Sequence, residues 1–193
     1  MKVRIINLDK RTDRWHTAQK QLRSFGINEF ERFSAYSTPT AVIGNARSHF
    51  QCLTDGANLI FEDDIFFEPF AQEVFNKAVE QLPEDWDILY LTGNIQEPLK
   101  KFSENLYRCT FAWGSCAILY SDKGRKYVLD HYRFDAMPFT IYDEWLRLQS
   151  ADKLQAYITF PVISWTYGGI SDVNGYYSNY EKLMKQNAAK HML

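Results

Sequence analysis

The order of its apolar stretches is the sequence feature that most limits how this chain can fold. The run VRIINL at residues 3–8 is almost continuously apolar, as in a central parallel strand that is buried on both faces. Over residues 15–25 the apolar positions instead recur every three or four residues, which predicts a helix that Thr12 or Asp13 caps and Gly26 ends. The chain therefore begins with a strand followed by a helix.

The same alternation continues along the rest of the chain. It predicts helices over about 46–53, 70–82, 122–131 and 142–148, and strands over about 59–61, 86–91, 115–120 and 157–165. Ser121 or Asp122 is the expected cap of the helix at 122–131. Residues 168–180, after the last predicted strand, are rich in Gly, Ser, Asn and Tyr and are expected to form a loop. This alternation predicts an α/β fold with a mostly parallel sheet flanked by helices.

Length, charge and cysteine content narrow the class of protein. At 193 residues the chain is expected to form a single domain over 1–193, and its net charge of −2 argues against nucleic-acid binding. No stretch approaches the roughly 20 apolar residues that span a bilayer, and no secretory signal is visible, so we expect a cytoplasmic protein. The three cysteines, Cys52, Cys109 and Cys116, match no zinc-binding spacing and are expected to be reduced and buried.

Three consecutive carboxylates, Glu62, Asp63 and Asp64, follow the predicted strand at 59–61. Their mutual repulsion raises their pKa values unless cations or hydrogen bonds compensate for it. A divalent metal ion is one such cation, and hard oxygen ligands suit Mg²⁺ or Mn²⁺. A solvated acidic turn, or a carboxylate that caps the next helix, is the alternative. Because ligands gather beyond the carboxyl ends of parallel strands, we favour a metal site.

A second pair of carboxylates, Asp143 and Glu144, opens the helix predicted over 142–148. Neighbouring residues on a helix point about 100° apart, so the two cannot face one reacting group equally. A carboxylate near a metal site can act as a general base for an attacking hydroxyl group. We expect Asp143 to be the general base, with Glu144 as the alternative.

Six segments of the chain together resemble glycosyltransferase family 25, the group of lipopolysaccharide and collagen galactosyltransferases. They are INLDKRTDRW at 6–15, GNARSHF at 44–50, LIFEDDIFF at 59–67, DILYL at 87–91, SCAILYSDKGRKYVL at 115–129 and YDEWL at 142–146. The resemblance implies a GT-A-like fold with a Rossmann-like nucleotide-binding half, a UDP-sugar donor, Mn²⁺ (or Mg²⁺), and transfer with inversion to a hydroxyl of a glycan or other acceptor. The resemblance also implies that the transferred sugar is galactose and that the pathway is lipopolysaccharide biosynthesis.

The resemblance also implies roles for single residues. Asp64, with Asp63 or Glu62, matches the metal-binding acidic motif of the family, and Asp143 matches the acidic position of its later motif. Ser48 and His49 match its Ser-His pair, although a histidine on an apolar helix can equally be a hydrogen-bonded core residue. Arg11 and Arg14 follow the first strand, where they can contact a diphosphate or form a solvated helix face. The expected donor site comprises Asn7, Leu8, Arg11, Arg14, Ser48, His49 and Asp63.

Aromatic residues make up 16% of the chain, enough to ask whether some of them bind sugar rings instead of filling the core. The candidates for the acceptor site lie near glycines and are Trp113, Trp165, Tyr167, Tyr176 and Tyr177. The tail at about 168–193 is expected to form an acceptor-side loop and a helix. Its lysines suit either a solvated helix or peripheral contact with a membrane, and His191 is either a late metal ligand or part of a frayed end.

Two other functions remain open at this point. A nucleotidyltransferase also combines a parallel sheet with metal-binding carboxylates, but it usually has a Gly-rich phosphate loop after the first strand, which this chain lacks. The second is a catalytically silent protein of the same fold that binds a nucleotide sugar or a glycan, which the short segment between Phe33 and Gly44 would suit.

Overall fold

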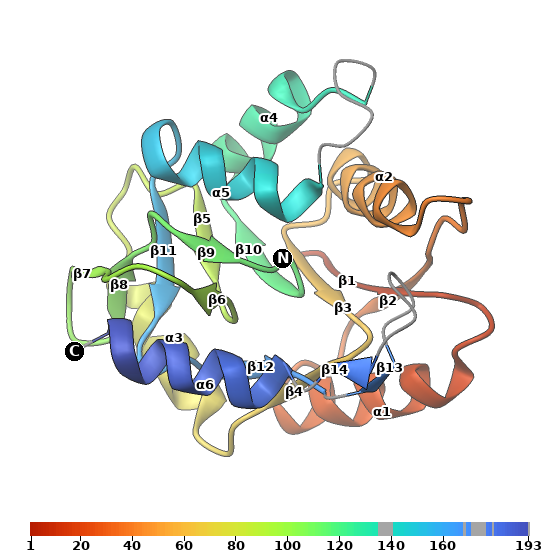
Figure 1. Cartoon of the computed structure of the whole chain (residues 1–193), viewed down its shortest axis with the longest axis horizontal. Helices are drawn as coiled ribbons and strands as arrows, with labels where there is room; N and C mark the ends of the chain where they lie inside the picture. Colours follow the sequence, from red (N-terminus) through yellow and green to blue (C-terminus); the bar gives the residue numbers. More distant parts are fainter. Residues whose placement is uncertain (135–140, 168, 171–176, 179, 193) are drawn as a thin grey trace.

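An eight-stranded sheet forms the centre of the molecule (Figure 1). The computed structural model describes residues 1–134, 141–167, 169–170, 177–178 and 180–192. In spatial order the strands are β2 (Glu31–Ser34), β1 (Val3–Asn7), β3 (Leu59–Glu62), β10 (Ala117–Tyr120), β5 (Ile88–Tyr90), β11 (Ala156–Thr159), β8 (Leu106–Arg108) and β7 (Lys100–Lys101). All of them run in one direction except β10 and β8. The predicted α/β fold with a mostly parallel sheet is therefore confirmed.

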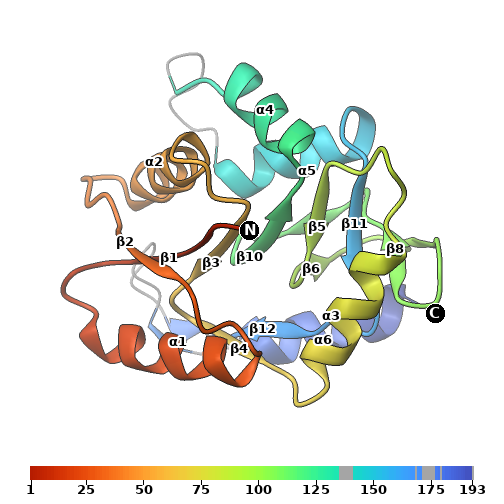
Figure 2. The same ribbon diagram turned by 180° about the vertical axis from the view of Figure 1, so that it is seen from behind.

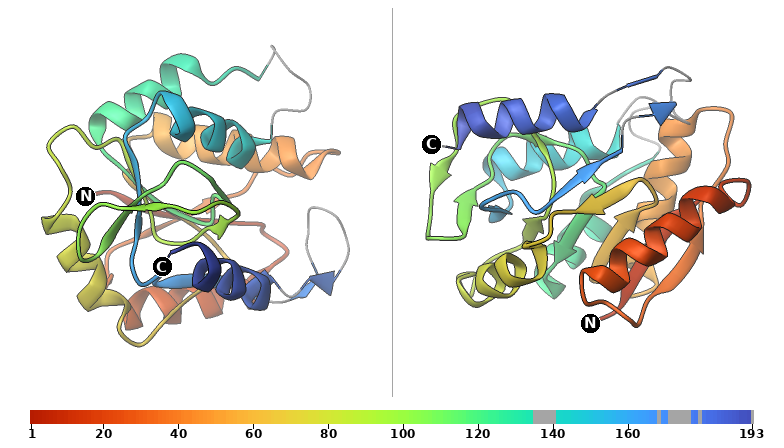
Figure 3. Two further views of the ribbon diagram at one scale, coloured as in Figure 1. Left: turned by 60° about the vertical axis from the view of Figure 1, so that its left-hand side comes forward. Right: turned by 90° about the horizontal axis from the view of Figure 1, so that it is seen from below.

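Helices cover both faces of this sheet. On one face lie α2 (Ala41–Thr54), α4 (Asp122–His131) and α5 (Tyr142–Asp152), and on the other lie α1 (Thr12–Ser24) and α3 (Ala71–Glu80), as Figures 1 and 2 show. Helix α6 (Tyr180–His191) packs beside β6 (Asn94–Ile95) and β12 (Ser164–Thr166) (Figure 3). Short antiparallel pairs join β6 to β9 (Ala112–Trp113), β12 to β4 (Ile65–Phe67), and β13 (Gly169–Ile170) to β14 (Tyr177–Ser178). No helix among the described residues is long and apolar enough to cross a membrane.

The central strands are buried on both faces, as their apolar sequences predict. In β3, Leu59 and Phe61 pack with the α1 and α3 side of the core, whereas Ile60 packs on the opposite side. In β5, Leu89 joins the first of these clusters and Ile88 the second. Each fully buried side chain of this size contributes about 1.5–3 kcal/mol relative to an exposed one. Packing on both faces fixes the position of β3 in the sheet and therefore the position of Glu62 at its carboxyl end.

Several local predictions are confirmed and others are wrong. Gly26 follows α1 with φ +88°, and the Ser121 side chain caps α4 by accepting a hydrogen bond from the Gly124 N–H (2.9 Å). Thr12 and Asp13 do not cap α1, because the helix already begins at Thr12 and Arg11 occupies the cap position without a side-chain bond. Asp13 instead accepts hydrogen bonds from the Arg11 guanidinium.

The strand predicted over 157–165 is in fact two strands in different sheets. β11 ends at Thr159 and β12 begins at Ser164, and Pro161 between them has no N–H to donate to a strand ladder. Nor is this the last strand, because β13 and β14 lie within the segment predicted as a loop.

Candidate functional site

The acidic triplet lies at the edge of the sheet where the parallel strands end. β1 and β3 run side by side with Ile6 opposite Glu62, so the residues after both strands meet there. β10 runs the other way, which brings the residues before it, Ser115 and Cys116, to the same edge. The Glu62 N–H donates to the Cys116 carbonyl at 2.8 Å. Three strands thus supply this site.

Glu62 is held by side chains from two other elements. Its Oε1 accepts hydrogen bonds from Ser115 Oγ (2.8 Å) and Asn45 Nδ2 (3.1 Å), and it lies 3.0 Å from His49 Nε2. Burial acts to raise the pKa of Glu62, but the hydrogen bond and charge of His49, with the bonds from Ser115 and Asn45, outweigh it and lower the pKa to about 2. Glu62 is therefore ionised at neutral pH.

Asp64 stands in the opposite situation. Burial and the charge of Glu62 raise the pKa of Asp64 to about 7, although Arg14, whose Nη1 lies 3.5 Å from Oδ2, acts in the other direction. Its Oδ1 is buried and has no hydrogen-bond partner. A buried carboxylate oxygen without a partner is costly unless a cation satisfies it.

Asp63 has hydrogen-bond partners on β1 and α1. It accepts hydrogen bonds from Asn7 Nδ2 (2.6 Å) and Arg14 Nη1 (3.2 Å). Burial raises the pKa of Asp63 above its usual range, while Asn7 and Arg14 act to lower it. Asn7 is itself fixed by Arg32, whose Nε donates to its Oδ1 at 2.8 Å. Asp63 therefore ties the acidic turn to β1.

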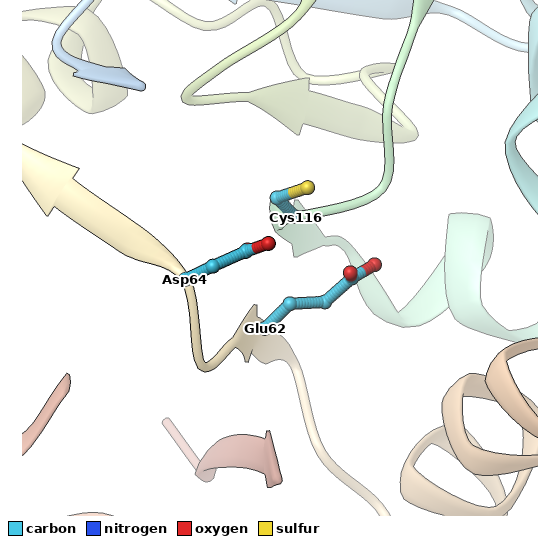
Figure 4. A group of neighbouring side chains, drawn as sticks. All are labelled: Glu62, Asp64 and Cys116. Atoms are coloured by element: carbon cyan, nitrogen blue, oxygen red, sulfur yellow. The ribbon is translucent and has the colours of Figure 1, made fainter. Parts of the chain in front are cut away.

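Within the described part of the chain, Glu62, Asp64 and Cys116 lie close enough together to hold a metal ion (Figure 4). Their potential ligand atoms lie within 4.8 Å of one another. Burial and the charges of Glu62 and Asp64 raise the pKa of the Cys116 thiol well above its usual value. A thiol is a weak ligand, whereas two carboxylates with one buried oxygen unpaired fit a hard cation such as Mg²⁺ or Mn²⁺.

Two cavities adjoin this acidic group, and Asn45, Glu62 and Asp64 line both of them. The smaller cavity, about 320 Å³, is also lined by Leu8, Lys10, Arg14, Tyr36 and Thr38. The larger, about 600 Å³, is also lined by Thr92, Trp113, Cys116, Asp143 and Glu144. The arrangement provides space for one ligand on each side of Glu62 and Asp64.

The two carboxylates at the start of α5 differ in their surroundings. Burial, and then the charge of Glu62, raises the pKa of Asp143, whose Oδ1 accepts the Glu144 N–H at 2.9 Å. Glu144 accepts two hydrogen bonds from the Arg147 guanidinium (2.7 and 2.5 Å) and one from Trp113 Nε1 (2.5 Å). The bonds from Arg147, and then that from Trp113, lower the pKa of Glu144. The raised pKa makes Asp143 the better proton acceptor of the two.

The predicted donor residues differ in whether they line the smaller cavity. Leu8 and Arg14 line the smaller cavity, and Asn7 lies behind Asp63. Arg11 pairs with Asp13, at 3.1 Å. Ser48 accepts a hydrogen bond from the Tyr36 N–H (2.9 Å), and its hydroxyl donates to the Gly44 carbonyl (2.7 Å), whereas the His49 ring stacks on Tyr142 with centroids 4.8 Å apart. Ser48 and His49 are fully buried and support the site from behind.

The aromatic candidates are also divided by the structure. Trp113 lines the larger cavity, but Trp165 is buried and donates to Glu68 at 2.8 Å, and Tyr167 stacks on Phe66. Tyr177 is exposed, and Tyr176 lies outside the described residues. His191 ends α6, where its carbonyl accepts the Leu99 N–H, and it does not belong to the group with Glu62 and Asp64.

Sequence reasoning missed several residues of the site. Asn45, Ser115 and Cys116 contact or adjoin Glu62, and Lys10 lines the smaller cavity. Lys10 follows the first strand closely, and that position could have marked it. Ser115 and Cys116 precede their strand, so they reach the site only because β10 is reversed, which no local pattern reveals.

Comparison with known proteins adds little beyond the fold. No protein-family model and no curated protein sequence matches the chain. Among solved structures it is similar to A197 from STIV, with a TM-score of 0.48 and 11% identity over 86% of each chain. It is also similar to a candidate glucose-1-phosphate thymidylyltransferase from Bacillus anthracis (TM-score 0.43, 14% identity, 98% of this chain and 76% of that one). A third is a glycosyltransferase involved in glycosylation of the major capsid of PBCV-1, with a TM-score of 0.44 and 8% identity over 98% of this chain and 100% of that one.

At these scores the likenesses leave the function to be argued from the site, and membership of glycosyltransferase family 25 stays a prediction.

Proposed function

We propose that this protein is a metal-dependent glycosyltransferase that moves a sugar from a nucleotide diphosphate sugar to a hydroxyl group. The observation that carries the proposal is the meeting of two cavities at Glu62 and Asp64. A transferase must hold two substrates with their reacting atoms close together. The smaller cavity suits the donor and the larger one the acceptor.

The donor side contains the cations that a diphosphate requires. Lys10 and Arg14 line the smaller cavity next to Asp63 and Asp64. Arginine and lysine bind phosphate oxygens through charge-assisted hydrogen bonds. UDP as the nucleotide and galactose as the sugar rest on the sequence resemblance.

Glu62 and Asp64 are the residues that would hold Mn²⁺ or Mg²⁺. The unpaired, buried Oδ1 of Asp64 and the ionised Glu62 support this assignment. A metal ion held by these two residues would neutralise charge that develops on a departing diphosphate. Asn45, His49 and Ser115 hold the Glu62 carboxylate in place by their contacts with Oε1.

On the acceptor side we assign the general base to Asp143. Its carboxylate takes the proton of the acceptor hydroxyl as that oxygen bonds to the anomeric carbon of the sugar. The bond from the anomeric carbon to the diphosphate oxygen breaks, and its electron pair leaves with the nucleotide. Because the hydroxyl attacks from the face opposite the leaving group, the configuration at that carbon is inverted.

The first test is calorimetric titration of the protein with UDP in Mn²⁺ and after treatment with EDTA. We expect binding to require the metal and Asp64→Asn to weaken it by at least about tenfold. Asp130→Asn, an exposed carboxylate on α4 that pairs with Lys126, is the matched control and should bind as the wild type does. Equal affinity in EDTA and in Mn²⁺ would show that the metal assignment is wrong.

Turnover decides between an enzyme and a silent binding protein. Hydrolysis of UDP-galactose, UDP-glucose and UDP-N-acetylglucosamine should be compared without acceptor, and we expect UDP-galactose to be the best substrate. UDP binding without hydrolysis of any of the three would instead indicate a catalytically silent protein. Release of pyrophosphate from a nucleoside triphosphate and a sugar phosphate would indicate a nucleotidyltransferase.

A further inference from the structure

We propose that Trp113 is a stacking platform for a pyranose ring, so that the acceptor is a carbohydrate and not a peptide or simple alcohol. This inference rests on the proposed function, because it concerns the acceptor side of the same site. It also assigns Glu144 a role different from that of a base.

The exposure of Trp113 is the first observation. Its side chain lines the larger cavity and is 37% exposed, whereas Trp165 is 5% exposed. Sugars have an apolar ring face and a rim of hydroxyl groups, and sites that bind them combine aromatic faces with a few polar groups. Thr92 and Asn94 line the same cavity and supply such polar groups.

The second observation is that the indole is held in one orientation. Trp113 Nε1 donates to Glu144 Oε2 at 2.5 Å, and the Arg147 guanidinium grips both oxygens of Glu144 (2.5 and 2.7 Å). Arg147 in turn lies 4.4 Å from the ring centroid of Phe111. A ring ordered before the ligand arrives loses less entropy on binding.

The position of this platform relative to the base is the third observation. Glu144, which holds Trp113, directly follows Asp143 on α5, and both acids line the larger cavity. Because the two acids are consecutive residues, the start of α5 links the stacking surface to the proton acceptor. A pyranose stacked on Trp113 would therefore lie in the cavity that Asp143 also lines. Glu144 is thus a positioning residue, and its two partners occupy its carboxylate.

The test is saturation-transfer NMR with methyl β-galactoside, methyl β-glucoside and methyl α-mannoside, with and without UDP and Mn²⁺. Glycerol and N-acetylserine amide serve as probes of the other acceptor classes. We expect saturation transfer to the ring protons of at least one pyranoside, and none to either of the other probes. Trp113→Leu should weaken that binding by about tenfold or more, and Trp113→Phe by less. Phe102→Leu removes an aromatic ring of similar exposure outside the cavity and should bind as the wild type does.

Variants of Glu144 separate positioning from a general structural effect. Glu144→Ala should weaken pyranoside binding, and Glu144→Gln should recover most of it, because its side-chain oxygen can still accept the Trp113 N–H. Wild-type affinity in Trp113→Leu, or binding of only a non-carbohydrate probe, would overturn the platform. If pyranosides bind through Trp113 but UDP with Mn²⁺ does not bind, the platform stands as a glycan site and the proposed function fails.

Discussion

Asp64 illustrates at the scale of one residue how a functional site costs stability. Its carboxyl group is buried beside the charges of Glu62 and Asp63, which Arg14 and a backbone hydrogen bond offset only in part, and one oxygen has no partner. Such groups persist in proteins where activity requires them, and replacing them often stabilises the fold.

We therefore predict that Asp64→Asn raises the melting temperature of the metal-free protein while it abolishes stabilisation by Mn²⁺. The pKa of Asp64 is raised from 3.8 to about 7, so the native state keeps a proton that the unfolded chain loses, and stability falls as the pH rises between these values. The amide does not titrate, so its advantage should be larger at pH 8 than at pH 5. Thermal melts in EDTA at both values check this, and an advantage independent of pH would contradict it.

We predict that Asp143→Asn lowers turnover by about 10² to 10⁴ while UDP affinity and melting temperature stay near wild type. The amide keeps an oxygen that can accept the Glu144 N–H, so the start of α5 is preserved. Glu144→Gln should have a smaller effect on turnover, acting through acceptor binding. Steady-state kinetics at saturating donor separate the two variants. Near-normal turnover in Asp143→Asn, or a loss of turnover that is explained by unfolding, would show that Asp143 is not the general base.

The sequence identified the acidic triplet but not the orientation of its members. Which of Glu62, Asp63 and Asp64 share one space depends on Asn7, which holds Asp63 against β1, and on Arg14, which contacts both Asp63 and Asp64. It also depends on Ser115, which reaches Glu62 from a distant part of the chain. Contacts of this kind are decided by tertiary packing, and local spacing carries no information about them.

At the scale of elements, the close contact of α4 with the start of β5 depends on a glycine. A Cβ atom added to Gly124 would lie 2.1 Å from the Asp87 carbonyl oxygen, which belongs to rigid backbone. The same carbonyl accepts the Ser121 N–H at 2.9 Å, so the helix and the strand are joined at this point. Moving α4 away from β5 would break this hydrogen bond at the start of the helix.

We predict that Gly124→Ala destabilises the protein by about 1–3 kcal/mol, because the added methyl group forces backbone apart. Helix propensity alone predicts the opposite sign, a gain of about 1 kcal/mol. Lys126→Ala, an exposed position of the same helix, is the control and should change the free energy of unfolding little. Urea denaturation of both variants measures the difference, and a stabilised Gly124→Ala would show that α4 can shift.

Elements with strong patterns could be predicted, and short exposed ones could not. The helices α1, α3, α4 and α5 and the strand β3 carry clear apolar periodicity and stand where it places them. β2 is mostly exposed and β7 consists of two lysines, so neither has an apolar signal, and only pairing with a neighbour makes them strands. The break at Pro161 was visible, but an apolar run on both sides of it hid the change of sheet.

At the scale of the whole molecule, one sheet separates two apolar layers and belongs to both. Ile88 and Tyr90 of β5 pack in one layer and Leu89 in the other, and β3 is divided in the same way. We predict a single cooperative unfolding transition in EDTA, because neither layer can be lost without exposing the strands that it shares with the other. Near- and far-ultraviolet circular dichroism should give coincident urea midpoints. Separate midpoints would contradict the single domain that the length of the chain predicts.

Because the reversed strand β10 comes late in the sequence, the chain exposes unpaired strand edges while it is being synthesised. It fills the gap between β3 and β5, yet it follows both of them in the sequence. Until residues 117–120 have been synthesised, β3 has one unpaired, apolar edge, and β5, whose other neighbour β11 comes later still, has two. Edges of that kind recruit strands from other chains. A nascent chain that stalls before residue 115, or a fragment that ends before it, is therefore an aggregation hazard and not a smaller working domain. It also lacks the Ser115 hydroxyl that donates to Glu62.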